Sequence, residues 1–312
     1  MNRNKTLSKN SVIVITGPTA SGKTSLSIDL AVEIESEIIS ADSRQVYKLM
    51  DICTAKPSQE EMNGVKHHLV DFLDPSEEYS AGKFSEDATR LINNSFNSEN
   101  IPIVCGGSAF YIKALFEGLF EEKNIRKPEV REELNRNLDH LGLEYLQNHL
   151  QKIDPITYSK IELDNPHRVI RALEYYYSTG ELISDAYDKR NNKLSDFQPI
   201  YFAIDYKREE LYRRINLRCE QMWNNGLVNE YKSLISLGYD KNLNSLNTVG
   251  YKESKDFINK IYDETQALEE FKKNTRRFAK RQLTWFRKND KINWLDGKSE
   301  NKLEQIIDII KS

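Results

Sequence analysis

The chain contains little cysteine, and its few thiols form no pattern that would bind a metal or build a disulfide framework. Only three of its 312 residues are cysteine, at Cys53, Cys105 and Cys219. They form no CxxC pair and no zinc-ligand spacing. This scarcity favours a protein of a reducing compartment that has no structural metal.

Long apolar runs are also absent. No stretch of 18 apolar residues occurs, and the polar residues 1–10 lack the apolar core of a signal peptide. With 38% hydrophobic and 30% charged residues, the chain can still bury a core. We therefore expect a soluble, cytoplasmic protein of one large domain or two, with no membrane contact.

A strong overall charge is missing as well, since the formal net charge is −3. That value alone argues weakly against nucleic acid. However, residues 272–288 hold eight basic residues and no acidic one. A nearly neutral total can therefore conceal a local basic face.

Short apolar runs alternate with helical segments in residues 1–116, and the pattern returns at residue 200. Strands are predicted at 12–16, 37–41, 101–105 and 200–204, with another possible at 68–72. Helices are predicted at 22–35, 81–98, from 108 onward, and at 207–223, 226–237, 251–260 and 265–289. This alternation predicts an α/β fold, a parallel sheet flanked by helices, with ligands beyond the carboxyl ends of the strands.

Residues 117–199 differ from both flanks, because they are polar, charged and helical in pattern. We interpret them as a helical insertion domain, so that 1–116 and 200–312 together form the α/β core.

Residues 17–24 read GPTASGKT and match the phosphate loop GxxxxGK[ST], placed between a buried strand and a helix. Backbone amides, the helix N-terminus and Lys23 suit phosphate oxygens, and the Thr24 hydroxyl suits Mg²⁺. The loop predicts binding of a di- or triphosphate without saying which. The expected phosphate ligands are Gly17, Thr19, Ala20, Ser21, Gly22, Lys23 and Thr24.

Asp42 follows the second predicted strand and should face the same crevice as the phosphate loop. It could be a general base, a metal-assisting acid, or only a capping or turn residue. A P-loop ATPase normally has an acid closing a second apolar strand, but the strand 101–105 ends in glycines. The acid that assists the metal is therefore ambiguous.

Strings in this order along the chain resemble the motifs of the tRNA dimethylallyltransferases, of the bacterial type. They are GPTASGKT at 17–24, ISADSRQVY at 39–47, MDICTAKP at 50–57, HHL at 67–69, DP at 74–75, YS at 79–80, CGGS at 105–108, RVIRALE at 168–174, GYKE at 250–253 and NTRRFAKRQLTWFR at 274–287. The resemblance covers the chain from the phosphate loop to about Trp294. Ser108 and Cys53 depart from the usual Thr and Gly of the family.

The resemblance implies that a dimethylallyl group moves from its diphosphate to N6 of the adenosine beside the tRNA anticodon. The phosphate loop, Lys23 and Mg²⁺ would stabilise the departing diphosphate. Asp42 would accept the proton of the attacking amine, and Ser108 would lie near the same nucleotide. Arg214 and Arg218, four apart on one predicted helix, resemble positions near the diphosphate, although they could equally be a solvated face.

The target adenine must leave its stack to be reached. Residues expected to contact tRNA are Asp42, Ser43, Arg44, Gln45, Ser108, Arg168, Lys280 and Arg281. On the C-terminal helix most basic residues should share one broad face, which could be an ordinary solvated one, whereas Phe271, Phe278, Trp285 and Phe286 should cluster opposite, against the core.

Other interpretations stay open. A P-loop kinase for a small metabolite, a non-catalytic RNA-binding protein and a prenyltransferase for free adenine nucleotides all fit a phosphate loop. The basic helix and the insertion favour a polymeric acceptor. His67 and His68 point to opposite faces of a strand, so we expect structural roles for both. We expect a monomer, and the cysteines needed for a C-terminal zinc finger are missing.

Overall fold

The structure of the protein is a computed structural model that describes residues 10–118, 127–188 and 196–312. The chain divides into two compact units, Met1–Phe116 with Ser195–Ser312, and Glu117–Leu194. The stretches 119–126 and 189–195 of the predicted insertion lie outside the described residues.

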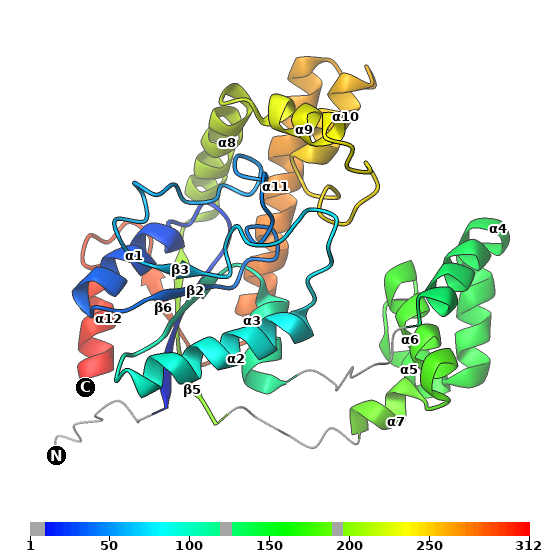
Figure 1. Ribbon diagram of the computed structural model, residues 1–312, viewed down its shortest axis with the longest axis horizontal. Helices are drawn as coiled ribbons and strands as arrows, with labels where there is room; N and C mark the ends of the chain where they lie inside the picture. The colour runs from blue at the N-terminus through cyan, green and yellow to red at the C-terminus, as the bar shows by residue number, and fades with distance from the viewer. Residues whose placement is uncertain (1–9, 119–126, 189–195) are drawn as a thin grey trace. The chain divides into compact units, whose positions relative to one another are not determined.

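One parallel β-sheet forms the centre of the first unit (Figure 1). Every pair of neighbouring strands is parallel. In order across the sheet the strands are β3 (His67–His68), β2 (Ile38–Ser40), β4 (Ile103–Gly106), β1 (Ser11–Thr16), β5 (Gln198–Asp205) and β6 (Ile292–Asp296). With its flanking helices, this sheet confirms the predicted α/β fold.

The unbroken apolar runs of the sequence form the middle of this sheet. All residues of β1 and β4 are buried, as expected for parallel strands that are covered on both faces. Thr16 of β1 pairs with Gly106 of β4, and Ser40 of β2 pairs with Cys105. The loops that follow these three strands therefore leave the sheet side by side at its carboxyl edge.

Helices cover the sheet and continue into a C-terminal bundle. Their bounds are α1 Lys23–Glu33, α2 Ala81–Asn97, α3 Ala109–Glu117, α8 Arg208–Asn224, α9 Leu227–Ser236, α10 Tyr251–Ile258, α11 Glu264–Phe286 and α12 Lys302–Lys311. Leu30 of α1 and Ile306 of α12 share a core with the strands. A second core joins α8, α9, α10 and α11 to the chain that follows β2, through residues such as Ile215 and Tyr47. This second core fixes α8 and α11 beside the carboxyl edge of the sheet.

Four details of the predicted fold differ from the structure. The possible strand at 68–72 is wrong beyond His68, because Leu69 and Asp71 have backbone φ angles of 61° and 58°. These left-handed conformations end the extended backbone. The final strand β6 and helix α12 were not predicted, and β5 begins at Gln198 rather than at residue 200.

The described residues of the second unit form helices around a core of their own. The helices are α4 Pro128–Ile153, α5 Pro155–Lys160, α6 Pro166–Thr179 and α7 Ile183–Asp188. Leu146 and Leu150 of α4 pack with Val169 and Leu173 of α6. A kink at Gly142, with φ 83°, divides α4. Among the helices described in either unit, none is long and apolar enough to cross a membrane.

Candidate functional site

The loop between β1 and α1 is shaped to hold an anion. Gly17, Ala20 and Gly22 have φ angles of 140°, 64° and 88°, and these turn the backbone in a way that L side chains rarely allow. Gly22 is the N-cap of α1, and no side chain there accepts a hydrogen bond from the first amides of the helix. These amides and the partial positive charge of the helix end form a site for a phosphate group.

Two cations without a carboxylate partner lie at this loop. The Nζ of Lys23 is 3.3 Å from the Pro18 carbonyl oxygen, and Arg218 of α8 lines the same cavity with no ion pair or hydrogen bond to the described residues. Burial lowers the pKa of Lys23, and the nearby Arg218 lowers it further. Burial also lowers the pKa of Arg218. Both side chains are half-buried, and charges that are partly withdrawn from water and lack a partner are unfavourable, so an anion between them would be stabilised.

Arg214 lies one helical turn before Arg218 and supports the loop itself. Its Nε donates to the Ala20 carbonyl oxygen at 2.9 Å. Its guanidinium lies over the ring of Tyr206, 4.8 Å from the ring centre. The structure thus places both predicted arginines against the phosphate loop, Arg214 on the backbone and Arg218 on the cavity wall.

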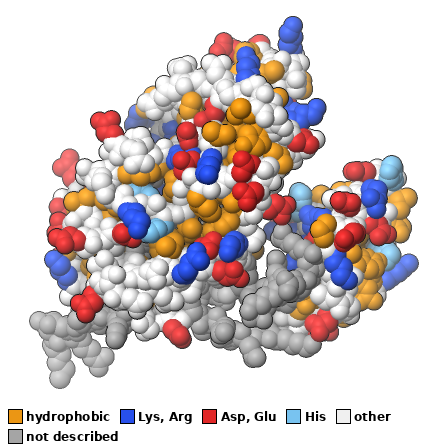
Figure 2. All heavy atoms as spheres, viewed as in Figure 1, with side chains coloured by type: hydrophobic (Ala, Val, Ile, Leu, Met, Phe, Trp, Pro, Cys, Tyr) orange, Lys and Arg blue, Asp and Glu red, His pale blue; other side chains and the backbone are white. Residues whose placement is uncertain are grey.

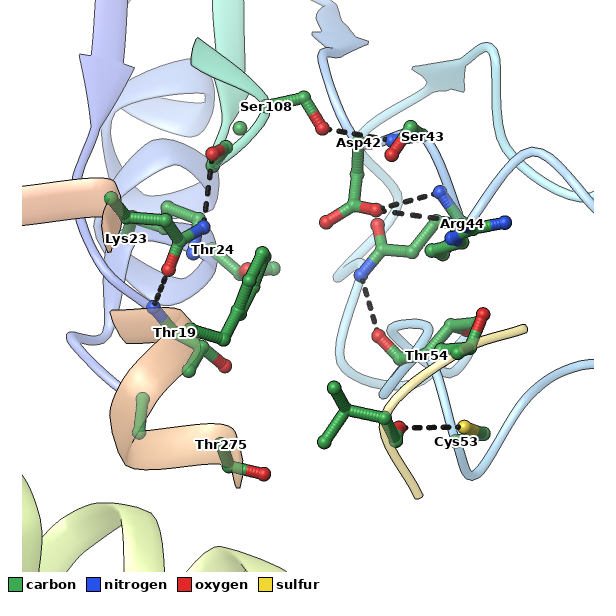
Figure 3. A pocket seen from close by; sticks show the side chains of 18 of the residues that line it. Thr19, Lys23, Thr24, Asp42, Ser43, Arg44, Cys53, Thr54, Ser108 and Thr275 are labelled. Atoms are coloured by element: carbon green, nitrogen blue, oxygen red, sulfur yellow. Dashed lines mark hydrogen bonds between the residues drawn. The ribbon is translucent and has the colours of Figure 1, made fainter. Parts of the chain in front are cut away.

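Asp42 lies across the cavity from Lys23 and Thr24 (Figure 3). Its Oδ1 accepts hydrogen bonds from the backbone N–H groups of Arg44 at 2.9 Å and Gln45 at 3.4 Å. The residue therefore does form the turn that the sequence allowed. Its second carboxylate oxygen has no partner among the described residues, which leaves it available to a proton or a ligand in the cavity.

The loop after β4 requires its two glycines. A Cβ on Gly106 would lie 2.1 Å from the Ala41 carbonyl oxygen, so any side chain there would separate β4 from the chain after β2. The next residue but one, Ser108, accepts a hydrogen bond from the Ser43 N–H through its Oγ at 3.0 Å. Its hydroxyl proton remains free to be donated. Ser108 therefore aligns the Asp42 loop and can also contact a ligand.

These loops and the helices α8 and α11 enclose a cavity of about 390 Å³ within the first unit. Its polar end is formed by the phosphate loop, Asp42 and Arg218, and its other walls combine apolar side chains with polar ones such as Asn247 and Thr275. The apolar lining includes Cys53, Val249, Ile215, Cys219, Met222, Phe271 and Phe278. The cavity thus offers one end for a diphosphate and another for a short hydrocarbon.

All three cysteines of the chain line this cavity. Burial raises the pKa of each thiol, well above the ordinary value for Cys53 and to about 11 for Cys219. Thiols that stay protonated behave as small apolar side chains and are poor nucleophiles. The cysteines therefore act as apolar residues of the cavity wall. Among the described residues, no group of three His, Cys, Asp or Glu side chains is placed to hold a metal ion.

The residues at the loop fit a magnesium ion that is shared with a bound diphosphate. Mg²⁺ prefers oxygen ligands and usually keeps several waters, together with one or two protein groups and substrate phosphates. The Thr24 hydroxyl and the free oxygen of Asp42 both face the cavity. They are oxygen donors of the right kind, too few to hold the ion without the diphosphate.

Comparison with known proteins agrees with this geometry. Residues 45–289 match the sequence model of the family described as IPP transferase. The tRNA dimethylallyltransferase of Alkaliphilus oremlandii is 42% identical over 302 residues, which are 97% of this chain and 96% of that protein. The chain belongs to the IPP transferase family. This confirms the family predicted from the motifs.

Solved structures of the family share the fold. The tRNA isopentenylpyrophosphate transferase of Bacillus halodurans has a TM-score of 0.72 and 36% identity, with 96% of this chain and 95% of that chain covered. A eukaryotic dimethylallyltransferase acting on tRNA has a TM-score of 0.81 and 29% identity, with 96% and 78% covered. The likeness extends over almost the whole of this IPP transferase family member.

Several cations of the basic stretch at 272–288 are paired with acids in the structure. Lys272 is only 8% exposed and forms ion pairs with Glu220 and Glu269, both at 2.8 Å. Lys273 pairs with Glu270, and Arg287 pairs with Asp205. The acids thus come from neighbouring turns and elements, which the acid-free stretch of sequence did not reveal. Over the face drawn in Figure 2, too, basic and acidic side chains are interspersed.

A smaller group of cations, on α11 and just after its end, is exposed around a second hollow of about 420 Å³. We call this group the basic surface; it consists of Arg277, Lys280, Arg281 and Lys288. Trp285 lines the same hollow, and Arg281 also lines the first cavity. The prediction that the aromatic residues of α11 all face the core is wrong for Phe278, which is 40% exposed and lines the first cavity. It is also wrong for Trp285, which is half-buried and lines the second hollow.

Other predicted tRNA contacts have partners of their own. Arg44 Nη1 donates to the Asn244 carbonyl oxygen at 2.7 Å, and Gln45 Nε2 donates to the carbonyl oxygens of Thr54 and Ala55. Ser43 lines the cavity. Arg168 is exposed at the start of α6 in the second unit, where it pairs with Glu162 at 3.5 Å.

The histidine pair has separate contacts. His68 Nε2 lies 2.6 Å from Glu37 Oε2. His67 Nδ1 lies 3.0 Å from the Val65 carbonyl oxygen, and burial lowers the pKa of His67. The two rings therefore do not converge on one ligand, although His67 also lines the first cavity.

Sequence reasoning missed two side chains that hold the site together. Glu230 of α9 accepts hydrogen bonds from three successive N–H groups, those of residues 51–53, and from the Tyr251 hydroxyl. Gln282 of α11 bridges Thr19 and Gly107. Gln282 lies within the recognised motif 274–287. No local sequence pattern indicates the role of either residue, because each side chain forms hydrogen bonds with backbone groups that are far away in the sequence.

Proposed function

We propose that this protein transfers a dimethylallyl group from dimethylallyl diphosphate to N6 of the adenosine next to the anticodon in tRNA, releasing diphosphate. One observation carries the proposal. Two half-buried cations that have no carboxylate partner among the described residues, Lys23 and Arg218, face an available carboxylate, Asp42, in a cavity that also has an apolar wall.

The donor fits the cavity by its two ends. The diphosphate lies at the start of α1, against the amides, Lys23 and Arg218. The five-carbon group lies along the apolar wall that includes Cys219 and Met222. As the allylic C–O bond breaks, negative charge grows on the diphosphate. Cations and amides already aimed at that charge stabilise it in the transition state.

The acceptor nitrogen forms the new C–N bond and must lose a proton. The free oxygen of Asp42 accepts this proton, so that the alkylated amine of the product is neutral. Ser108 holds the loop that carries Asp42, and its hydroxyl donates a hydrogen bond to the nucleotide. Mg²⁺, held by Thr24 and the diphosphate, would add positive charge to the leaving group.

The tRNA anticodon stem-loop is the polymeric partner in this proposal. Its target adenine is extruded into the cavity beside Ser43, Arg44 and Gln45. The basic surface, on α11 and just after its end, neutralises phosphates near the cavity mouth. Arg168 of the second unit, the helical insertion, contributes a further phosphate contact. We also propose that the protein acts as a cytoplasmic monomer.

A kinase is the alternative that the phosphate loop alone would allow. The donor test uses dimethylallyl diphosphate labelled in the prenyl group, with Mg²⁺ and unmodified tRNA, and a parallel reaction with ATP labelled in the γ-phosphate. The acceptor test replaces tRNA with free AMP. We expect prenyl label in tRNA alone. Labelled phosphate in any product, or prenylation of AMP in preference to tRNA, would reject the proposal.

A further inference from the structure

Gln282 reaches from α11 into the gap between the phosphate loop and the glycine pair. Its Oε1 accepts a hydrogen bond from the Thr19 N–H at 2.9 Å, and its Nε2 donates to the Gly107 carbonyl oxygen at 2.9 Å. The Thr19 end of this bridge can be followed in Figure 3. Gln282 is only 7% exposed. One side-chain amide thus ties together two loops that bound the cavity.

The bridge is fixed by packing as well as by hydrogen bonds. A Cβ on Gly107 would lie 2.4 Å from Gln282 Nε2 and 3.5 Å from the Gly17 carbonyl oxygen. The glycine pair, the start of the phosphate loop and Gln282 therefore meet with no room for another side chain. Rotation of the Gln282 amide would break both hydrogen bonds, so its carbonyl oxygen stays directed at Thr19.

This arrangement changes what the phosphate loop can bind. In P-loop proteins that bind a nucleoside triphosphate, the backbone amides and the lysine cradle successive phosphates. Here the amide of Thr19 is already used by Gln282. A polyphosphate extending from the start of α1 toward Thr19 would find no free donor there. It would also approach the Oε1 atom of Gln282, a carbonyl oxygen that carries partial negative charge.

We propose that Gln282 is a specificity-determining residue that limits the phosphate loop to a diphosphate and discriminates against a third phosphate. The inference rests on the proposed function, because it concerns the same loop that holds the prenyl diphosphate. Two linked phosphates of a nucleoside triphosphate resemble the diphosphate of the prenyl donor. A phosphate loop with all its amides free would therefore bind nucleoside triphosphates as well. Gln282 keeps the cavity available for the prenyl donor.

The test measures binding of two simple anions and needs no turnover. Calorimetric titration gives the affinities for inorganic pyrophosphate and for inorganic tripolyphosphate, both with excess Mg²⁺. The proteins compared are the wild type, Gln282→Ala, Gln282→Asn and Gln221→Ala, the last being the same substitution at an exposed position of α8. We expect the wild type and Gln221→Ala to prefer pyrophosphate equally.

In Gln282→Ala the Thr19 amide becomes free, and the affinity for tripolyphosphate should rise by about tenfold or more relative to pyrophosphate, the effect of one hydrogen bond to a charged group. A folded variant with the wild-type ratio, or an equal loss of both affinities, would overturn the inference. Should Gln282→Ala not fold, Gln282→Asn, too short to bridge both loops, is measured in the same way. A wild type that binds neither anion would reject the diphosphate site itself, whereas an unchanged ratio rejects only the role of Gln282.

Discussion

The Ser108 hydroxyl accepts a hydrogen bond from the Ser43 N–H at 3.0 Å and thereby joins the loops that follow β4 and β2. Asp42 lies immediately before Ser43, so its carboxylate is held between this contact and its own bonds to Arg44 and Gln45. The carboxylate is thus fixed on one side and available on the other. A proton acceptor with this placement reacts without first reorganising its loop.

Substitution of Asp42 by Asn should separate binding from chemistry. The Asn Oδ1 can still accept the hydrogen bond from Arg44, so the loop should keep its shape, but an amide cannot take the proton. We expect kcat to fall by roughly a hundredfold to ten-thousandfold, with little change in KM for tRNA. Steady-state kinetics measure both, with Asp290→Asn, at an exposed position, as the control. Near-normal turnover would remove Asp42 from the mechanism.

The unpaired cation Arg218 should be needed for the ligand rather than for the fold. In Arg218→Met, pyrophosphate affinity should fall by about tenfold to a hundredfold. The melting temperature without ligand should not fall, because the substitution removes a half-buried charge that has no partner among the described residues. Titration calorimetry and thermal denaturation give the two values. Arg213→Met, at an exposed arginine paired with Glu210, is the matched control. A lower melting temperature with intact affinity would show a structural role instead.

The lowered pKa of Lys23 predicts how diphosphate affinity depends on pH. Burial makes this amine lose its proton at a lower pH than the ordinary value of 10.5. As the pH rises through that lowered pKa, the cation is lost and pyrophosphate affinity should decline. An arginine stays charged in this range. Lys23→Arg should therefore abolish the decline, and a decline that persists in this variant would assign it to another group.

Glu230 should stabilise the loop at 51–53, because the Glu230 carboxylate accepts hydrogen bonds from all three backbone N–H groups of that loop. In Glu230→Gln the new NH₂ group would face backbone donors. We expect a loss of about 2 kcal/mol in the free energy of unfolding, measured by urea titration. Glu209→Gln, at an exposed position on α8, should change it little. Equal stability of the two variants would contradict this role.

Charge removal on the basic surface should alter the salt dependence of tRNA binding. Lys280 and Arg281 are exposed on α11, and each phosphate contact contributes about one to the slope of log affinity against log salt. Lys280→Gln with Arg281→Gln should therefore reduce that slope by about two. Filter binding over a range of salt concentrations measures it. Loss of Arg213, whose charge is already paired with Glu210, should leave the slope unchanged.

The sequence predicted local features well where the physics is local. The buried runs at 12–16 and 101–105 and the loop at 17–24 follow from apolar continuity and glycine placement, and the structure has β1, β4 and the phosphate loop there. The cavity could be anticipated because parallel strands bring Asp42 and Lys23 to one edge.

Contacts between distant segments could not be predicted in the same way. Glu230 and Gln282 act on backbone groups about 180 and 260 residues away, and no spacing rule connects them. The same limit explains the basic stretch at 272–288, where acids on α8 and at the end of β5 form ion pairs with part of a stretch that looks purely basic. Only the fold shows which of its cations remain unpaired.

Nucleoside analysis of the reacted tRNA tests the central claim most directly. Unmodified tRNA is incubated with dimethylallyl diphosphate, Mg²⁺ and either the wild type or Asp42→Asn, then digested and separated by mass-detected chromatography. The account predicts one new product with the wild type, adenosine carrying the five-carbon group on N6, from the position beside the anticodon. It predicts almost none with Asp42→Asn, although that variant still binds pyrophosphate. Unaltered nucleosides with the wild type, or equal product from both proteins, would contradict it.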